Sequence, residues 1–516
     1  MTSPVRERAI LPLWAAFISA VVGGLALDAS FPSLGIWPLA FVAVALSLLS
    51  LIGRSAWSAL AVGFAFGAAF YFPHIDWAAR FLGENALSWV PWAALAGIES
   101  VFMGAGAVLI ALGYRWVSRT MRPGTARLAA TSLVAAGVWT SRELIMGSWP
   151  YGGFPWGRIG MSQSLSPLAS VASWVGVTGL TFLMVLATAF AIEAARLIRA
   201  EAPGRWWSPA APVVLLIVLI LVPQFRTADA GSLRVAAVQG NGPTAYLDEG
   251  GRYEVLDAQL AASAAAVGAD PDLVVWPEGG VGVDPLTDQN AAAVLDRAVS
   301  AIGAPILINA AVADGELVFN RSMLWTADGA AQSHDKRYPV PFGEYVPQRE
   351  FYERIVPSLI EMIGREYEPG TNSPVMDVDG VRAALAICFD VLFDQHIEEG
   401  IAGGAEVLIF QTNNADFRGT DENLQQLAFA RMRAIESGRS VVNVSTVGTS
   451  QVIAPDGTTI DQIGVDEAGA IIADVELREG TTPGVWAGAG IRGFLLWMPL
   501  AALAIFGVLA SRSARD

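Results

Sequence analysis

The segment Leu273-Val274-Val275-Trp276-Pro277-Glu278-Gly279-Gly280 starts as an uninterrupted apolar run and ends at a proline, a carboxylate and two glycines. A short run that is apolar on both faces is typical of a strand in a sheet that other layers cover on both sides. Because proline cannot continue such a strand, the chain turns here and presents Glu278 at the strand end. The segment therefore predicts an α/β domain with a layered sheet.

The region around this segment, from residue 232 to about residue 473, alternates short β-rich runs with helical stretches. Strands are predicted at residues 233–238, 273–276, 306–311, 383–388, 407–411 and 441–445, and helices at 289–302 and 421–437. This alternation supports the α/β class for the middle of the chain.

Apolar stretches dominate the two flanks of this domain. Hydrophobic residues make up 53% of the 516-residue chain and charged residues 16%, so a wholly soluble protein is not expected. Eight stretches approach the roughly 20 apolar residues that cross a bilayer: 9–27, 35–53, 57–73, 88–113, 128–146, 166–194, 210–224 and 491–511. We predict a multi-pass α-helical membrane protein with an inserted α/β domain. Its parts are a membrane domain with seven transmembrane helices at 1–225, the α/β domain at 226–490, and an eighth transmembrane helix with a short tail at 491–516.

Charge follows the same boundaries. Residues 1–225 hold 13 basic and 8 acidic side chains, whereas residues 226–490 hold 16 basic and 39 acidic ones. Such an acidic domain is a poor partner for nucleic acid. In alternate short loops of the flanks, twelve arginines lie on one side of the predicted membrane and three on the other. The positive-inside rule then predicts that both termini are cytoplasmic and the acidic domain extracytoplasmic.

Two residue types occur once each. Lys336 is the single lysine among 32 basic residues, and Cys388 is the single cysteine. One cysteine excludes an intramolecular disulfide and nearly excludes a cysteine-based metal site. Lys336 stands in a proline-rich loop, and Cys388 follows the apolar run that ends at Ile387.

Together with Glu278, these two residues form a plausible nucleophilic set. Glu278 can take the proton of the Cys388 thiol, because the thiolate is the reactive form. A cation such as Lys336 favours the thiolate and, with a backbone N–H, stabilises the oxyanion of a tetrahedral intermediate. Taken alone, a cysteine in an apolar run is usually a small core residue. The interpretation as a nucleophilic site therefore depends on the combination of Cys388 with Glu278 and Lys336.

The three motifs resemble the Glu-Lys-Cys triad of the nitrilase superfamily, whose fold is a four-layer αββα sandwich. Further motifs at 153–156, 238–241, 341–347 and 430–436, together with the flanking spans, resemble the apolipoprotein N-acyltransferase family. The resemblance implies a bacterial plasma-membrane enzyme with an extracytoplasmic nitrilase-like catalytic domain at 226–490. Neither a cofactor nor a metal is implied, since a phospholipid ester already supplies an activated acyl group.

The implied reaction has two steps. Cys388 attacks an acyl ester of a membrane phospholipid to give a thioester, and the α-amino group of a diacylglyceryl apolipoprotein then attacks that thioester. Glu278 is the implied base, Lys336 stabilises both oxyanions, and Glu344 supports the triad. Phe389-Asp390 stands where the family usually has Tyr-Glu.

An aromatic loop between two predicted spans is the candidate substrate-binding surface. Trp149, Phe154 and Trp156 lie there among glycines and prolines. Such a loop suits a platform for a lipid or a lipidated peptide, and it also fits an ordinary interfacial aromatic belt.

Two alternatives stay open at this point. A membrane-tethered nitrilase-type amidase would use the same triad with water as the acceptor. A transporter or a binding scaffold with an inactive domain would need neither the triad nor an acceptor. The complete triad and the small number of intramembrane charges beyond Glu99 argue against this alternative.

Overall fold

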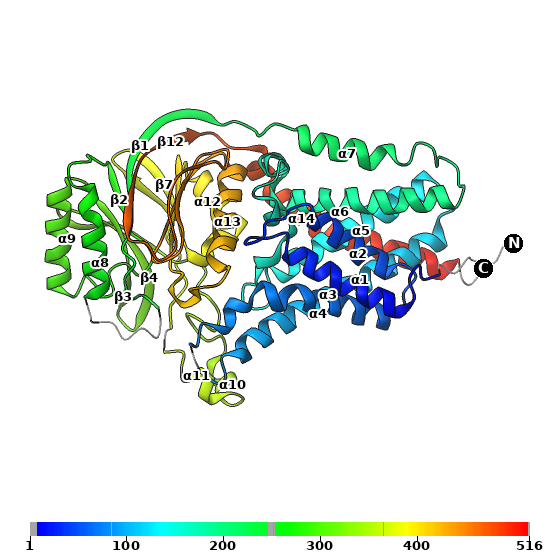
Figure 1. Cartoon of the computed structure of the whole chain (residues 1–516), viewed down its shortest axis with the longest axis horizontal. Helices are drawn as coiled ribbons and strands as arrows, with labels where there is room; N and C mark the ends of the chain where they lie inside the picture. The colour runs from blue at the N-terminus through cyan, green and yellow to red at the C-terminus, as the bar shows by residue number, and fades with distance from the viewer. Residues whose placement is uncertain (1–7, 84, 246–250, 252, 365, 514–516) are drawn as a thin grey trace. The chain divides into compact units, whose positions relative to one another are not determined.

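The chain folds into two compact units, described here from a computed structural model (Figure 1). The structure describes residues 8–83, 85–245, 251, 253–364 and 366–513. The helical unit comprises Met1–Asp76, Trp89–Pro223 and Ala487–Asp516, and the sheet unit comprises Trp77–Ser88 and Gln224–Trp486.

The helical unit has one helix in each of the eight predicted apolar stretches. These are α1 (Leu13–Asp28), α2 (Leu39–Leu51), α3 (Ala56–His74), α4 (Trp89–Thr120), α5 (Thr125–Met146), α6 (Ala172–Arg199), α7 (Ala210–Leu221) and α14 (Pro483–Arg512). Within the described ranges, four spans are long and apolar enough to cross a membrane: Ala56–His74, Trp89–Thr120, Ala169–Arg199 and Pro483–Arg512. Shorter apolar helices are α1, α2 and α7.

Small residues let the helices of this unit pack closely. A Cβ atom added to Gly63 of α3 would lie 2.3 Å from the Cβ atom of Ala107 of α4. Close backbone approach at glycine and alanine is the usual way in which membrane helices associate. Several ionisable residues are buried here, among them Glu99 of α4 and Arg142 of α5, which are exposed by 3% and 7%. Arg142 is one of the three arginines that the sequence analysis assigned to loops on the less basic side of the membrane, and it lies within α5 instead.

The sheet unit contains two six-stranded sheets. The first has the order β12-β1-β2-β3-β4-β5 and the second the order β11-β10-β9-β8-β7-β6. The strands are β1 (Ala228–Gln239), β2 (Leu273–Val275), β3 (Ile306–Asp314), β4 (Leu317–Thr326), β5 (Gly329–Asp335), β6 (Val375–Val378), β7 (Val381–Ile387), β8 (Val407–Thr412), β9 (Ser440–Ser445), β10 (Ser450–Ile453), β11 (Thr459–Ile463) and β12 (Gly469–Glu479). Strands β1, β2 and β3 are parallel, as are β7, β8 and β9.

Helices cover the outer faces of both sheets. They are α8 (Glu254–Ser263), α9 (Gln289–Ile302), α12 (Asp394–Ala402) and α13 (Glu422–Ser437), and two short helices, α10 (Arg349–Glu353) and α11 (Pro357–Ile360), lie in the loop between β5 and β6. In Figure 1, α8 and α9 flank one sheet and α12 and α13 the other. Apolar side chains such as Val235, Leu385 and Ile409 fill the space between the sheets. The unit is thus an αββα sandwich, as the resemblance to the nitrilase superfamily implied.

All eight strands and helices predicted for this unit are present. The strand predicted at 383–388 ends one residue earlier, because Cys388 starts a 3-10 turn, η6 (Cys388–Leu392). The strands that were not predicted include β5 and β12, which carry polar residues. Strand β5 is buried only at its last two residues, and β12 alternates between buried and more exposed positions. Such half-buried strands lack the continuous apolar run that identified the central ones.

A buried arginine network ties α13 to the segment after η6, and its loss should destabilise the sheet unit. The side chain of Arg433 is fully buried, and its Nη1 atom lies 2.7 Å from Asp394 Oδ1 and 2.5 Å from Glu436 Oε2. We expect Arg433→Ala to lower the free energy of unfolding by about 3–5 kcal/mol, because two buried carboxylates lose their partner. Thermal unfolding in detergent would show this as a lowered midpoint.

The matched control is Arg234→Ala on β1. Arg234 pairs with Asp474 on the surface, with side chains 41% and 64% exposed. Exposed pairs contribute about 0–1 kcal/mol, so this variant should unfold close to the wild-type midpoint. Equal destabilisation by both substitutions would contradict the argument.

Candidate active site

The lysine that the sequence analysis selected as a catalytic residue lies at the centre of a buried ion-pair network. Lys336 follows β5 and is 1% exposed. Its Nζ atom donates hydrogen bonds to Glu278 Oε1 at 3.0 Å and to Glu344 Oε1 at 2.8 Å. Glu344 Oε2 accepts a further bond from the Val340 backbone N–H at 2.8 Å. Three residues that the sequence singled out are therefore in direct contact.

The local sequence around Glu278 explains its position. Strand β2 ends at Val275, and Trp276 is fully buried behind the turn. Gly279 has a φ of +68°, a conformation that glycine adopts at no steric cost, and its N–H donates to Asn309 Oδ1 of β3 at 2.7 Å. The turn is thus anchored to the neighbouring strand and holds the glutamate over the sheet edge.

Cys388 lies on a strained turn immediately after β7. Its φ is +51°, which is uncommon for a residue other than glycine and costs on the order of 1–3 kcal/mol. The side chain is partly exposed, and Gln426 Nε2 lies 3.6 Å from Sγ. Strain of this kind presents a nucleophile at a fixed angle above the end of a sheet.

The charges around the thiol determine its resting state. Burial raises the pKa of Cys388 well above its usual value, Glu278 raises it further, and Lys336 acts in the opposite direction. Burial also raises the pKa of Glu278, against the lowering effect of Lys336. Burial alone would lower the pKa of Lys336, but Glu278, Glu344 and Cys388 raise it well above the usual value. Lys336 is therefore a permanent cation, and the thiol needs a base.

Asp390 connects the lysine loop to the cysteine turn. Its fully buried carboxylate accepts hydrogen bonds from the backbone N–H groups of Tyr338 at 2.8 Å, Arg337 at 3.3 Å and Ile387 at 3.2 Å. Its neighbour Phe389 is buried and packs edge-to-face on Phe393. The two residues that depart from the family pattern thus have structural contacts of their own.

The structure adds polar residues that sequence reasoning missed. Asn320 Nδ2 of β4 donates to Glu278 Oε1 at 2.7 Å. Asn414 Nδ2 donates to Glu422 Oε2 at 2.7 Å and to Gln426 Oε1 at 2.8 Å. Burial raises the pKa of Glu422 to about 8, although the Asn414 bond lowers it. These residues stand outside the motifs on which the sequence prediction of the site rested.

A loop between two membrane helices also belongs to the sheet unit. Trp77 follows α3, and its Nε1–H donates to Gln425 Oε1 at 3.3 Å. Its ring packs edge-to-face on Phe417 with centroids 5.0 Å apart. Because this loop stands among apolar stretches in the sequence, no local pattern predicts that it packs on the α/β domain.

The predicted substrate-binding aromatics lie in the helical unit. Trp149 is 63% exposed, whereas Trp156 is only 3% exposed. Phe154 stacks on Trp156 with centroids 5.9 Å apart. Trp149 is therefore the one of the three that offers a large free surface, and Trp156 serves the packing of its own loop.

Comparison with known proteins decides the family. Residues 23–190 match the apolipoprotein N-acyltransferase N-terminal domain, and residues 234–482 match the carbon-nitrogen hydrolase domain. An apolipoprotein N-acyltransferase from Mycolicibacterium smegmatis is 32% identical over 541 residues, covering 96% of this chain and 86% of the relative. The chain belongs to the apolipoprotein N-acyltransferase family.

A second relative agrees with this membership. An apolipoprotein N-acyltransferase from Azotobacter vinelandii is 29% identical and covers 96% of this chain and 94% of the relative. Among solved structures, a nitrilase-superfamily amidase from Nesterenkonia AN1 is 20% identical with a TM-score of 0.38, covering 48% of this chain and 92% of that chain. The prediction of a membrane protein with an inserted nitrilase-like domain is confirmed, and so is that of an acyltransferase.

Proposed function

We propose that this family member transfers an acyl chain from a membrane phospholipid to the α-amino group of the S-diacylglyceryl cysteine at the N-terminus of apolipoproteins. The observation that carries the proposal is the buried Lys336, bonded to Glu278 and Glu344 and electrostatically coupled to Cys388. Glu278, Lys336 and Cys388 are the catalytic residues of the proposal, and Glu344 is its positioning residue.

The first half of the reaction forms a thioester. Glu278 takes the thiol proton while Sγ of Cys388 bonds to the ester carbonyl carbon of the phospholipid. Lys336 stabilises the resulting oxyanion. When the intermediate collapses, the C–O bond to the glycerol breaks and the proton on Glu278 passes to the departing alkoxide. The products are the acyl-enzyme and a lysophospholipid.

The second half forms an amide. The apolipoprotein amine bonds to the thioester carbonyl carbon, and Glu278 takes a proton from the nitrogen. Lys336 again stabilises the oxyanion. The C–S bond then breaks, and the proton returns from Glu278 to the sulfur. The enzyme is restored without any cofactor, because the energy of the donor ester is kept in the thioester.

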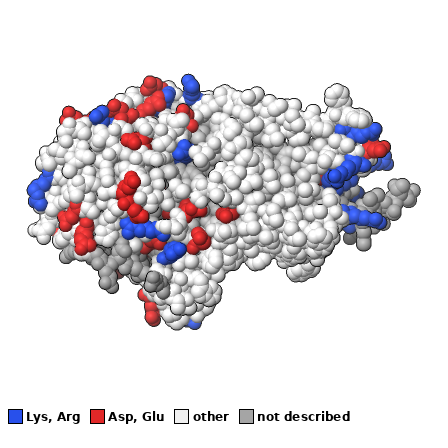
Figure 2. All heavy atoms as spheres, in the orientation of Figure 1, with Lys and Arg blue, Asp and Glu red and all other residues white. Residues whose placement is uncertain are grey.

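The membrane arrangement is part of the proposal. The chain is a bacterial membrane protein, and we place it in the plasma membrane with both termini cytoplasmic and the catalytic domain extracytoplasmic. The asymmetry of the loop arginines supports this orientation. Figure 2 shows a face of the helical unit that is nearly free of charged side chains between its ends. The terminal residues 1–7 and 514–516 lie outside the described residues.

A membrane-tethered amidase is less well supported. It would share the triad and use water as the acceptor, but it would not need the N-terminal domain matched at residues 23–190. The exposed Trp149 and the apolar helices suit a lipid substrate.

Intact mass spectrometry tests the proposal. After incubation with phospholipid vesicles, the protein should gain the mass of one acyl chain, hydroxylamine should remove it, and Cys388→Ala should never acquire it. A diacylglyceryl peptide should discharge the adduct and become N-acylated. A hydroxylamine-labile adduct on Cys388→Ala would contradict the mechanism, and discharge to free fatty acid alone would favour the amidase.

A further inference from the structure

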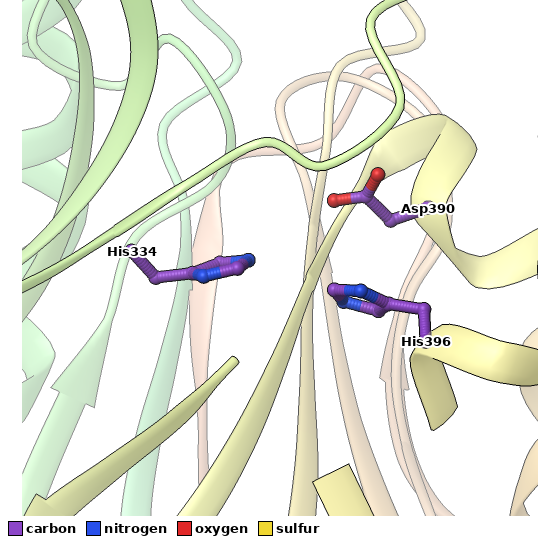
Figure 3. Close-up of side chains that lie close together, drawn as sticks. All are labelled: His334, Asp390 and His396. Carbon is purple, nitrogen blue, oxygen red and sulfur yellow. The ribbon is translucent and has the colours of Figure 1, made fainter. Parts of the chain in front are cut away.

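A second cluster of ionisable residues lies beside the triad but takes no part in the proposed chemistry. His334 at the end of β5, Asp390 on η6 and His396 on α12 converge in the interior of the sheet unit, and we call them the His–Asp cluster (Figure 3). The three residues are at most 1% exposed. One ligand atom of each lies within 4.8 Å of those of the other two.

Backbone carbonyl groups fix the tautomer of both imidazole rings. His334 Nδ1 lies 3.0 Å from the Ser373 carbonyl oxygen, and His396 Nε2 lies 2.7 Å from the Leu385 carbonyl oxygen. Since a carbonyl oxygen only accepts, each of these nitrogens must carry the proton. The remaining nitrogens, His334 Nε2 and His396 Nδ1, therefore present lone pairs.

These two lone pairs are buried and unpaired in the part of the chain that the structure describes. Neither His334 Nε2 nor His396 Nδ1 has a hydrogen-bond partner among the described residues. A buried acceptor without a partner costs about 1–3 kcal/mol, and here two of them meet beside a carboxylate. A metal cation placed between the two lone pairs and the carboxylate would satisfy all three groups.

We propose that the His–Asp cluster binds a divalent transition-metal ion such as Zn²⁺ through His334 Nε2, His396 Nδ1 and one Asp390 carboxylate oxygen. Imidazole rings that bind metals almost always donate their other N–H to a carbonyl or carboxylate group, as both rings do here. Two imidazole nitrogens and a carboxylate form a common donor set for zinc. At metal–ligand distances of about 2.0–2.2 Å the ligand atoms lie about 3.5 Å apart. Because all three separations are within 4.8 Å, each would shorten by at most about 1.3 Å on binding.

The location gives this ion a structural role. His334 belongs to an edge strand of one sheet, and His396 lies on the helix that packs on β7 of the other. Asp390 also holds the backbone of Arg337 and Tyr338 beside Lys336. The ion would clamp the lysine loop to the cysteine turn without touching the reacting atoms. The catalytic steps themselves still require no metal.

Metal content of the full-length protein tests the site directly. The chain is purified in detergent without a histidine tag and treated with a chelator. It is then dialysed first against Zn²⁺ and afterwards against zinc-free buffer, and its zinc content is measured by elemental mass spectrometry. We expect about one zinc ion per wild-type chain, and less than about 0.1 in the His334→Gln/His396→Gln double variant, which lacks both nitrogen ligands.

The controls use the unusual composition of the chain. His74 is the only other histidine and Cys388 the only thiol, so His74→Gln and Cys388→Ala should both keep the zinc. Less than about 0.1 zinc per wild-type chain would overturn the proposal, because a structural site retains its metal on dialysis. Unchanged zinc content in a folded double variant would overturn it as well.

A spectrum of the unaltered cluster covers the case in which the double variant does not fold. Electron paramagnetic resonance of His74→Gln loaded with one equivalent of Cu²⁺ should show hyperfine coupling to two imidazole nitrogens. A signal without nitrogen coupling would contradict the site. It would favour a proton or a water molecule shared between the rings.

Discussion

Replacing Lys336 with methionine is expected to lower kcat/KM for N-acylation by about 10³-fold or more. Removing a single oxyanion donor typically costs 10²–10³-fold. Here the same cation also separates two carboxylates, since its Nζ atom contacts both Glu278 and Glu344. Without it, the charge of Glu344 acts on Glu278 uncompensated and raises the pKa of Glu278. The variant would then lose its base together with its oxyanion donor.

A second substitution at the same position tests the geometry. Lys336→Arg keeps the positive charge but replaces a compact ammonium by a planar guanidinium. Because the side chain is 1% exposed and both contacts are 3.0 Å or shorter, we expect this variant to be nearly as inactive as Lys336→Met. The exposed pair partner Arg234 provides the control, and Arg234→Met should keep wild-type kinetics. Activity of Lys336→Arg within tenfold of wild type would show that charge alone suffices.

The parts of the fold that the sequence predicted are those with a strong periodic or apolar signal. The central strands β2 and β8 are buried on both faces, and α9 was predicted with its observed ends. The eight apolar stretches became eight helices for the same reason. The site residues could be identified because two of them are the single lysine and the single cysteine of the chain, and the third is a glutamate directly after a predicted strand.

The parts that could not be predicted depend on tertiary contacts. Asn320 becomes important only because β4 pairs with β3 and brings its amide to Glu278. Trp77 joins the sheet unit across 348 positions of sequence through Gln425. His334 and His396 look unremarkable 62 residues apart, and only the folding of β5 against α12 turns them into a cluster. A single sequence carries no signal for such pairings, because each partner has an ordinary local context.

Replacing Glu278 with glutamine is the second substitution expected to have a large effect, about 10³-fold on the rate of thioester formation. The amide is nearly isosteric and can still accept the Lys336 bond, so the contact network is kept while the base is lost. General bases contribute typically 10²–10⁴-fold. The thiol cannot compensate by itself, because burial, the largest of the causes that raise the pKa of Cys388, is still present in the variant. Single-turnover acylation, followed by the mass of the acyl-enzyme, measures the effect.

The pH profile separates loss of the base from a general disturbance of the site. In the wild type, acylation should fall as the pH drops through the pKa of Glu278, which burial raises above the ordinary glutamate value of 4.5. Glu278→Gln should lose this acid limb, and its residual rate should rise with pH as the thiol ionises. Glu422→Gln should keep the limb, because the pKa of Glu422 is about 8, and Glu316→Gln on the surface should change nothing. An acid limb that stays at the wild-type pH in Glu278→Gln would assign the base to another carboxylate, because the limb of the thiol, whose pKa burial raises well above its usual value, lies at higher pH.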